Sequence, residues 1–181
     1  MLETERLILR QFKEWDLDDL FEIVSNIKIC SMSGWYFIED IQSAKFLLNK
    51  IIQNPLHFAI VLKENNKVVG AIELMDYDEK SYIGVNILHG AKEIAFLLYE
   101  KYWGKGIMKE ALEIILDYAF NTLKIPQILA GNYADNAQSH RLQDKLGIKI
   151  VGEINKYKVL ENTHKKFFQR SITLSEFNLQ K

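Results

Sequence analysis

A glycine-containing turn is the first place in the sequence where residue types and spacing suggest chemistry. It lies in the stretch KYWGKGIMKEAL, residues 101–112. Gly104 and Gly106 let the backbone turn sharply and remove the Cβ atoms that would keep a ligand away. A helix is expected to begin there, and the N–H groups at its start, with Lys105 beside them, would favour an anion such as a pyrophosphate. An ordinary surface turn before a helix is the alternative.

Two further groups of polar residues could take part in chemistry. Asn136, Ser139 and Arg141 lie at the start of an expected short helix, NAQSHRLQDKLG, where Asn and Ser are also ordinary capping residues. Glu93 opens the apolar segment EIAFLL, whose burial would raise the carboxyl pKa toward the value that a general base near neutral pH requires. A glutamate that simply reaches water is the equal alternative.

The elements that must position these residues follow from the hydrophobic pattern. A helix is expected to begin at Asp16 as its N-cap, and Asn65-Asn66 is expected to form a hairpin turn. The nearly continuous apolar segment 92–98 is expected to be buried on both faces. We expect further helices over 40–53, 106–122 and 136–146, and strands over 4–12, 57–62, 67–75, 82–88, 92–98, 126–132, 149–155 and 167–174. This order predicts an α/β fold with a mixed, largely antiparallel sheet and helices on both faces.

Composition narrows the function classes. A chain of 181 residues is expected to form one domain, and a net charge of −1 argues against binding nucleic acid through its phosphates. Cys30 is the only cysteine and the four histidines are scattered, so neither a disulfide framework nor a metal site is expected. No apolar run approaches the ~18 residues of a membrane span. We therefore expect a soluble cytoplasmic domain with no membrane partner.

In their order, these segments resemble the GNAT superfamily of N-acetyltransferases, and within it the ribosomal-protein (Rim-type) branch that acetylates protein N-termini. TERLILR, residues 4–10, is similar to that branch's first strand, and EIAF, residues 93–96, to its E-I-G-Y strand. WGKGIM, residues 103–108, lies where the family has Q/R-x-x-G-x-G/A. NAQSHRLQDKLG resembles the family's N-x-x-S-x-R-x-x-x-K-L-G helix. The resemblance covers nearly the whole chain.

The resemblance implies direct transfer of an acetyl group from acetyl-CoA to a primary amine, either a protein N-terminus or a small molecule. It also implies that the strand 92–98 and the strand after the long helix splay apart around the pantetheine arm. Glu93 would deprotonate the amine, directly or through water, and Ser139 would protonate the leaving thiolate. The residues then expected to bind the coenzyme are Phe96, Leu97, Leu98, Trp103, Gly104, Lys105, Gly106, Ile107, Met108, Asn136 and Arg141.

Two features depart from the family pattern, and the role of a third is open. Met108 replaces a small residue and could narrow the pyrophosphate turn, and the expected strand 82–88 is additional and could shape the acceptor site. The aromatic residues 35–37 could form a wall of that site or simply pack on the core.

A non-catalytic acyl-CoA-binding module and a purely structural, partner-binding domain are the alternatives to an enzyme. Exposed strands expected at the C-terminus are compatible with a homodimer, and Glu73 is the next candidate for the base.

Overall fold

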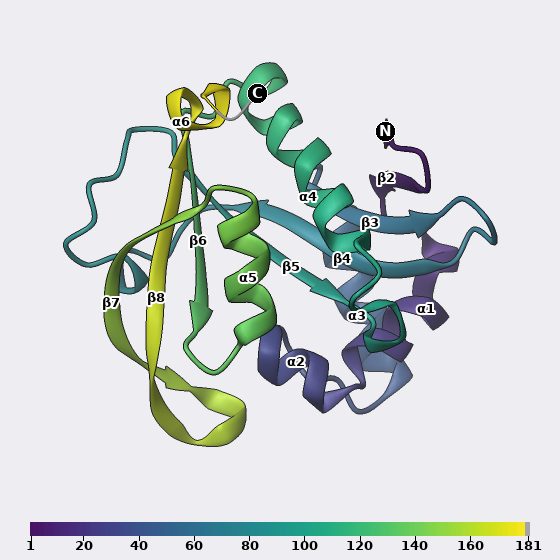
Figure 1. The fold of residues 1–181 in the computed structure, drawn as a ribbon. Helices are drawn as coiled ribbons and strands as arrows, with labels where there is room; N and C mark the ends of the chain where they lie inside the picture. Colours follow the sequence, from purple (N-terminus) through teal and green to yellow (C-terminus); the bar gives the residue numbers. More distant parts are fainter. Residues whose placement is uncertain (180–181) are drawn as a thin grey trace. The chain divides into compact units, whose positions relative to one another are not determined.

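One strand is shared by two units of the chain in the computed structural model, which describes residues 1–179 (Figure 1). This strand, β5 (Lys92–Leu98), begins in the unit formed by Met75–Ile94 and the chain from Ile115 onward. It ends in the unit formed by Met1–Leu74 and Ala95–Ile114. We call the unit that contains the N-terminus the first unit, and the other the second unit.

The first unit combines antiparallel strands with helices that begin at clear signals. Asp40 is the N-cap of α3, where its side chain accepts a hydrogen bond from the Ser43 backbone N–H, and Asn66 takes the left-handed conformation in the expected hairpin turn. The strands that precede β5 are β1 (Leu2–Glu3), β2 (Leu7–Gln11), β3 (His57–Leu62) and β4 (Val68–Met75). The helices are α1 (Leu17–Val24), α2 (Ile27–Ser33), α3 (Ile41–Ile52) and the first turns of α4 (Ile107–Asp117), with 3-10 turns at Glu14–Asp16 and Glu100–Tyr102.

Helices cover both faces of the strands in the first unit. Residues of α1, α2 and α3 share one hydrophobic cluster with Ala59 and Val61 of β3, on one face. Strand residues alternate between faces, so Ile60 and the buried Leu7 and Leu9 of β2 point to the other face. There α4 crosses β3 and β4 (Figure 1), which confirms helices on both faces.

The second unit is built around a long antiparallel pair. Its strands after β5 are β6 (Gln127–Tyr133), β7 (Lys149–Lys158) and β8 (Thr163–Thr173). The helical segments are a 3-10 turn (Glu79–Ser81), the end of α4 with a π-helical turn (Tyr118–Thr122), α5 (Ala137–Lys145), a second 3-10 turn (Val159–Glu161) and α6 (Leu174–Asn178). Gly147, with φ of 69°, follows the end of α5 as expected for a C′ glycine.

The strand order along the sheet is β1-β2-β3-β4-β5-β6-β8-β7. The pairs β1–β2, β2–β3, β3–β4, β6–β8 and β7–β8 are antiparallel, whereas β5 pairs with β6 in parallel. The partners in that parallel pair are Lys92 with Ile128 and Glu93 with Leu129. The mixed, largely antiparallel α/β fold is therefore confirmed, while the splay of β5 from β6 stays a prediction.

The expected strand 82–88 is wrong. Part of its backbone is bound by two glutamine side chains and part by turn hydrogen bonds, and the described residues form no strand there. Gln169 donates to the carbonyl oxygens of Ser81 and Ile83, at 3.1 and 3.2 Å, and the Gln127 side-chain oxygen accepts from the Leu88 N–H at 2.8 Å. Gly84 turns the chain with φ of 77°. The segment that the sequence suggested as an additional strand is a loop, and the side chains of Gln127 and Gln169 hold it by hydrogen bonds.

Other boundaries differ from expectation in smaller ways. Asp16 occupies the position before α1 without a capping hydrogen bond, because its carboxylate binds the Arg10 guanidinium at 2.6 and 2.9 Å. Helices α2 and α6 were not expected, and β7 and β8 are longer than predicted. In β5, Ile94, Leu97 and Leu98 are buried while the other residues are half-buried, so burial on both faces is only partly correct.

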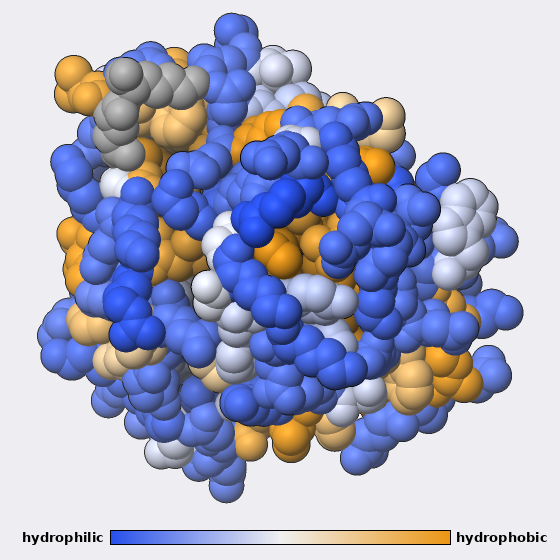
Figure 2. Space-filling model, turned by 45° about the vertical axis from the view of Figure 1, so that its right-hand side comes forward, coloured by the Kyte–Doolittle hydropathy of each residue, from blue (hydrophilic) through white to orange (hydrophobic). Residues whose placement is uncertain are grey.

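The face drawn in Figure 2 is mostly hydrophilic, and the hydrophobic areas on it are small and separate. Among the described residues, no helix has the length and apolar character needed to cross a bilayer. Ile150 and Val151 of the terminal strand β7 are about half exposed, and a homodimer through such a strand stays a prediction.

Candidate active site

The glycine turn of the first unit has the backbone geometry that the sequence suggested. Gly104 and Gly106 have φ of 73° and 77°, which residues with a Cβ rarely adopt. A Cβ added to Gly104 would have no atom within 4 Å, so the dihedral angle and not crowding requires glycine there. The Trp103 indole N–H donates to the Leu98 carbonyl oxygen at 2.8 Å, which fixes the turn to the end of β5. The structure thus joins two of the expected coenzyme-binding segments within one unit.

The N-terminal segment anchors the same turn. The Arg6 guanidinium donates to the Lys105 carbonyl oxygen at 3.0 Å and pairs with the Glu110 carboxylate of α4 at 2.6 Å. Lys105 itself is exposed, and its ammonium lies 5.2 Å from the centre of the Tyr102 ring. Sequence reasoning missed Arg6, since a contact across about a hundred residues leaves no local pattern.

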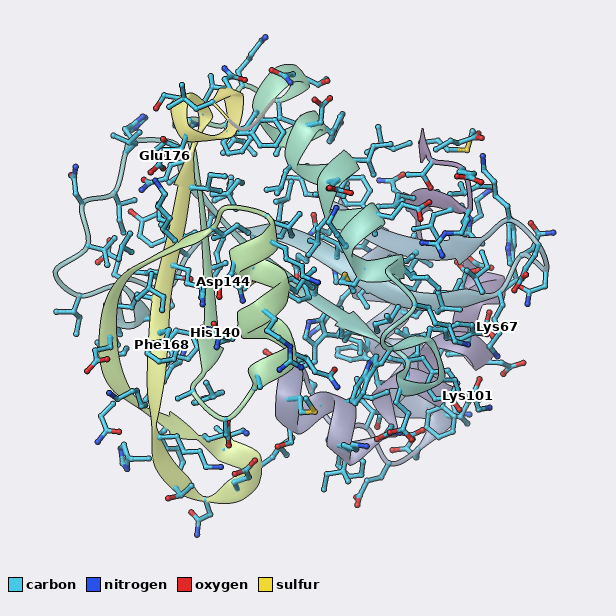
Figure 3. All side chains as sticks on the ribbon, viewed as in Figure 1. Lys67, Lys101, His140, Asp144, Phe168 and Glu176 are labelled. Carbon is cyan, nitrogen blue, oxygen red and sulfur yellow. The ribbon has the colours of Figure 1, made fainter. Side chains whose placement is uncertain are left out.

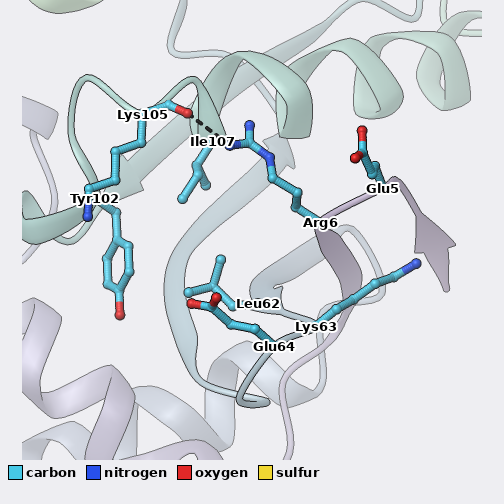
Figure 4. A pocket seen from close by; sticks show the side chains of 8 residues that line it. All are labelled: Glu5, Arg6, Leu62, Lys63, Glu64, Tyr102, Lys105 and Ile107. Carbon is cyan, nitrogen blue, oxygen red and sulfur yellow. Dashed lines mark hydrogen bonds between the residues drawn. The ribbon is translucent and has the colours of Figure 1, made fainter.

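A pocket of about 580 Å³ opens beside this turn (Figure 4). It is lined by both signs of charge, so its character is that of a mixed polar surface and not of a dedicated anion site. The lining residues are Glu5, Arg6, Leu62, Lys63, Glu64, Tyr102, Lys105 and Ile107.

The start of α4 presents backbone donors after the turn. The first N–H groups of an α-helix have no partner within the helix, and here Glu110 is the residue whose N–H reaches back to the Gly106 carbonyl oxygen. The side chains of Ile107 and Met108 are buried, at 4% and 7% exposure. The bulk of Met108 therefore lies in the interior, and the narrowing considered from the sequence does not follow from it.

The last residues of β5 approach β4 very closely. A Cβ on Gly70 would lie 2.5 Å from the Leu97 carbonyl oxygen, and the Tyr99 N–H donates to the Val69 carbonyl oxygen at 2.8 Å. Phe96 is half-buried and Leu98 is buried. Residues 96–98 thus form a strand end with a fixed backbone, directly before the Trp103 contact.

In the second unit, Glu93 is held by a buried tyrosine. The Tyr82 hydroxyl donates to Glu93 Oε1 at 2.7 Å. Burial raises the pKa of the Glu93 carboxyl, while the Tyr82 hydrogen bond and the Lys156 ammonium oppose that rise. Burial likewise raises the pKa of Tyr82, so its hydroxyl keeps its proton and acts as the donor. Glu93 is therefore a half-buried, hydrogen-bonded carboxyl group with a raised pKa, in the direction expected of a base. Tyr82 was missed because the sequence placed it in a strand.

Two polar residues at the start of α5 make different hydrogen bonds. Asn136 is the N-cap, since its side-chain oxygen accepts from the Ser139 backbone N–H at 3.0 Å. The Ser139 hydroxyl oxygen instead accepts from the Gln143 side-chain amide at 2.8 Å and is buried. Arg141 is exposed on the same helix. The capping interpretation thus holds for Asn136 and not for the Ser139 hydroxyl.

A buried arginine on β8 fixes α5 in the second unit. Arg170 is fully buried and donates to the Asp144 carboxylate at 2.8 Å, the Ile148 carbonyl oxygen at 2.7 Å and the Asn132 side-chain oxygen at 3.0 Å. It also contacts His140 Nδ1 at 2.8 Å, and Figure 3 shows His140 and Asp144 on α5. Because arginine only donates, His140 Nδ1 accepts and its Nε2 carries the proton. No local pattern identifies Arg170 as buried.

A second carboxyl group with a raised pKa lies in the first unit. Burial raises the pKa of Glu73, whose Oε1 accepts from the Asn54 amide at 3.0 Å and lies 3.7 Å from His57 Nδ1. The rings of Phe12 and Trp35 pack edge-on against His57, at 5.7 and 5.2 Å between centroids. Trp35 therefore packs on the core.

Among the described residues, no group of three or more His, Cys, Asp or Glu side chains could hold a metal ion.

The chain is similar to known N-acetyltransferases. A family model for the acetyltransferase (GNAT) domain matches residues 6–149. The uncharacterized N-acetyltransferase YoaA of Bacillus subtilis is 29% identical over 161 residues, which cover 87% of each chain. The [ribosomal protein uS5]-alanine N-acetyltransferase of Escherichia coli is 27% identical over 180 residues, covering 88% of this chain and 84% of that protein.

Solved structures show the same fold. A GNAT-family acetyltransferase from Bacillus anthracis superposes with a TM-score of 0.81 at 23% identity, covering 96% of this chain and 98% of that chain. Spermidine N-acetyltransferase from Vibrio cholerae, solved with CoA and spermine, gives a TM-score of 0.79 at 20% identity, covering 97% and 99%. The family match spans most of the chain, and the Rim-type resemblance is supported by the uS5-alanine enzyme. This chain is an N-acetyltransferase that belongs to the GNAT family.

Proposed function

We propose that this chain, acting as one acyl-CoA N-acyltransferase domain, transfers the acetyl group of acetyl-CoA to a primary amine by direct attack of the amine nitrogen on the thioester. The observation that carries the proposal is Glu93, a half-buried carboxyl group whose pKa is raised by burial and whose position is fixed by Tyr82. Such a group can accept a proton near neutral pH.

The coenzyme contacts that we propose are described for each unit by itself. In the first unit, the amides of residues 103–108 face the pyrophosphate, and the backbone of residues 96–98 faces the pantetheine arm. The open space at Gly104 and the helix start that follows are the features that fit an anion. In the second unit, Asn136 and the exposed Arg141 lie beside the coenzyme. Bound acetyl-CoA supplies an activated acetyl group and a thiol leaving group.

Glu93 makes the acceptor reactive. Lysine-like amines titrate near ~10.4 and α-amino groups near ~7.7–8.0, so most acceptors arrive as ammonium ions. Only the neutral amine attacks a thioester. Glu93 takes the proton directly or through a water, and Ser139 gives a proton to sulfur as the carbon–sulfur bond breaks.

The acceptor class is a primary amine, either a protein N-terminus or a small molecule. The named relatives include enzymes for the alanine of ribosomal protein uS5 and for spermidine. A panel should therefore contain peptides with a free N-terminal alanine, polyamines and amino acids, with thiol release from acetyl-CoA as the signal. Cys30 is buried and its pKa is raised to about 11 by burial, so the protein's own thiol reacts slowly with a reagent that detects the released CoA thiol.

Glu93→Gln tests the proposal because it keeps the shape and removes the basicity. We expect kcat to fall by roughly 10²–10⁴-fold with little change in coenzyme affinity. The loss of kcat relative to wild type should become smaller as pH rises, since neutral amine then becomes abundant. Glu153→Gln is the matched control, because Glu153 is an exposed carboxylate in the same unit. Wild-type kcat with an unchanged pH profile in Glu93→Gln would refute the role of Glu93.

Glu73 is the second candidate for the base. Its pKa is also raised by burial, and it lies beside His57 in the first unit. Glu73→Gln should leave kcat near the wild-type value if Glu93 is the base. A large loss of kcat in Glu73→Gln together with full activity in Glu93→Gln would identify Glu73, and not Glu93, as the base.

A further inference from the structure

Gln143 lies one helical turn after Ser139 on α5 and has no exposed surface. Its side-chain Nε2 is 2.8 Å from Ser139 Oγ and 3.5 Å from the Gly131 carbonyl oxygen of β6. Its Oε1 is buried and has no hydrogen-bond partner in the described part of the chain. Burying an amide oxygen without a partner costs stability, so this arrangement calls for an explanation.

The direction of the hydrogen bond determines what the serine hydroxyl can do. An amide NH₂ group only donates, so Ser139 Oγ is the acceptor. The Gly131 carbonyl oxygen favours this orientation, because turning the amide would place two oxygen atoms against each other. The single hydroxyl proton of Ser139 then has to point elsewhere, and the described residues form no hydrogen bond in which this hydroxyl is the donor.

We infer that Gln143 is a positioning residue that keeps the Ser139 hydroxyl proton available for the sulfur of the leaving thiolate. The inference rests on the proposed function, in which Ser139 is the proton donor. As the carbon–sulfur bond breaks, its electron pair goes to sulfur and the Ser139 proton moves to it. The N–H of Gln143 stabilises the negative charge that grows on Oγ, and the proton that the acylated amine nitrogen loses is returned to Oγ through water.

Two substitutions at residue 143 separate this role from packing. Gln143→Glu keeps the shape, but its carboxylate accepts the Ser139 proton and so withdraws it from sulfur. Gln143→Leu keeps the volume and removes both the donor and the unpartnered oxygen. We expect kcat to fall by about 10-fold or more in both variants, up to the ~10²–10⁴-fold that a general acid typically contributes, with KM for acetyl-CoA and for the amine unchanged.

The pH profile gives a readout that a packing role would not change. At low pH the Gln143→Glu side chain becomes a neutral acid that can again donate to Ser139 Oγ, so its activity relative to wild type should rise as pH falls. Gln143→Leu should show no such recovery. Gln138→Glu is the matched control, since Gln138 is exposed on the same helix and should behave as wild type at every pH.

Ser139→Ala distinguishes failure of the inference from failure of the proposed function. If Ser139→Ala has wild-type kcat, the proton-donor role fails and the inference with it. If Ser139→Ala is slow but Gln143→Leu and Gln143→Glu are fully active, only the inference is overturned. If Gln143 acts through Ser139, the double variant Ser139→Ala/Gln143→Leu should be no slower than Ser139→Ala alone. Additive losses would overturn the inference, and Gln143→Leu suffices if Gln143→Glu does not fold.

Discussion

At the residue scale, His57 is a buried imidazole in the first unit. It is 4% exposed, and the Phe12 and Trp35 rings pack against it. Burial lowers its pKa from 6.5 to about 4, so the folded protein keeps the ring neutral at a pH where the unfolded chain would protonate it. This residue therefore links stability to pH.

We predict that His57 makes the folded state less stable as the pH falls from 7 to 4. Between these values the unfolded state binds more protons, so the free energy of unfolding decreases. The stabilisation that comes from keeping His57 neutral is fully present above pH 6.5 and is lost as the pH falls to the folded-state pKa of about 4. Since one pKa unit corresponds to 1.36 kcal/mol, the free energy of unfolding should change by about 3 kcal/mol. Urea unfolding of wild type and His57→Phe at several pH values measures it. The same pH slope in both proteins would contradict the burial argument.

At the scale of elements, the contact between β4 and the end of β5 depends on one absent side chain. A Cβ on Gly70 would meet the Leu97 carbonyl oxygen at 2.5 Å, and the Leu98 and Ile60 side chains at 3.1 and 3.2 Å. The backbone oxygen cannot rotate away as a flexible side chain could. The pair must therefore separate to accept even a methyl group.

Gly70→Ala should destabilise the protein by about 1–3 kcal/mol, the usual cost of overpacking a core. It should also lower coenzyme affinity, since residues 96–98 are proposed to face the pantetheine arm. Denaturant midpoints and calorimetry measure the two effects. A Gly70→Ala protein with an unchanged midpoint would show that β4 and β5 do not approach this closely.

At the scale of the whole molecule, coenzyme binding should raise stability through mass action. A ligand at 100 times its Kd that binds only the folded state stabilises it by about 2.7 kcal/mol. We predict such a stabilisation by CoA in wild type, and its loss at the same CoA concentration in Gly104→Val, because valine resists a φ of 73° and its side chain would fill the open space proposed for the anion.

The chain contains a matched control for that experiment. Gly84 has φ of 77° and, like Gly104, no atom within 4 Å of an added Cβ. Gly84→Val imposes similar backbone strain on a loop that is not proposed to bind coenzyme. It should lose intrinsic stability but keep the CoA effect. Equal loss of the CoA effect in both variants would remove the turn from the coenzyme site.

Much of the fold could be predicted because its signals are local. Asp40 and Asn136 cap helices, Asn66 turns a hairpin and Gly147 ends α5, each within a few residues of the feature it determines. The same holds for α2, whose cap residues Asn26 and Gly34 were present in the sequence but not used. The order of the motifs also determined the family, since it depends on residue types along the chain.

Only the tertiary structure decided which side chains contact the candidate site residues. Tyr82 meets Glu93, and Gln143 meets Ser139 with a defined direction of donation, because folding buries these groups where protein atoms must replace water as hydrogen-bond partners. Arg170 reaches Asn132 across 38 residues for the same reason. In the loop at 82–88, glutamine side chains from two distant strands bind backbone atoms that a strand ladder would otherwise bind. Sequence determines the local conformations and the motifs, whereas the hydrogen-bond partners of buried polar groups depend on which distant segments the fold brings together.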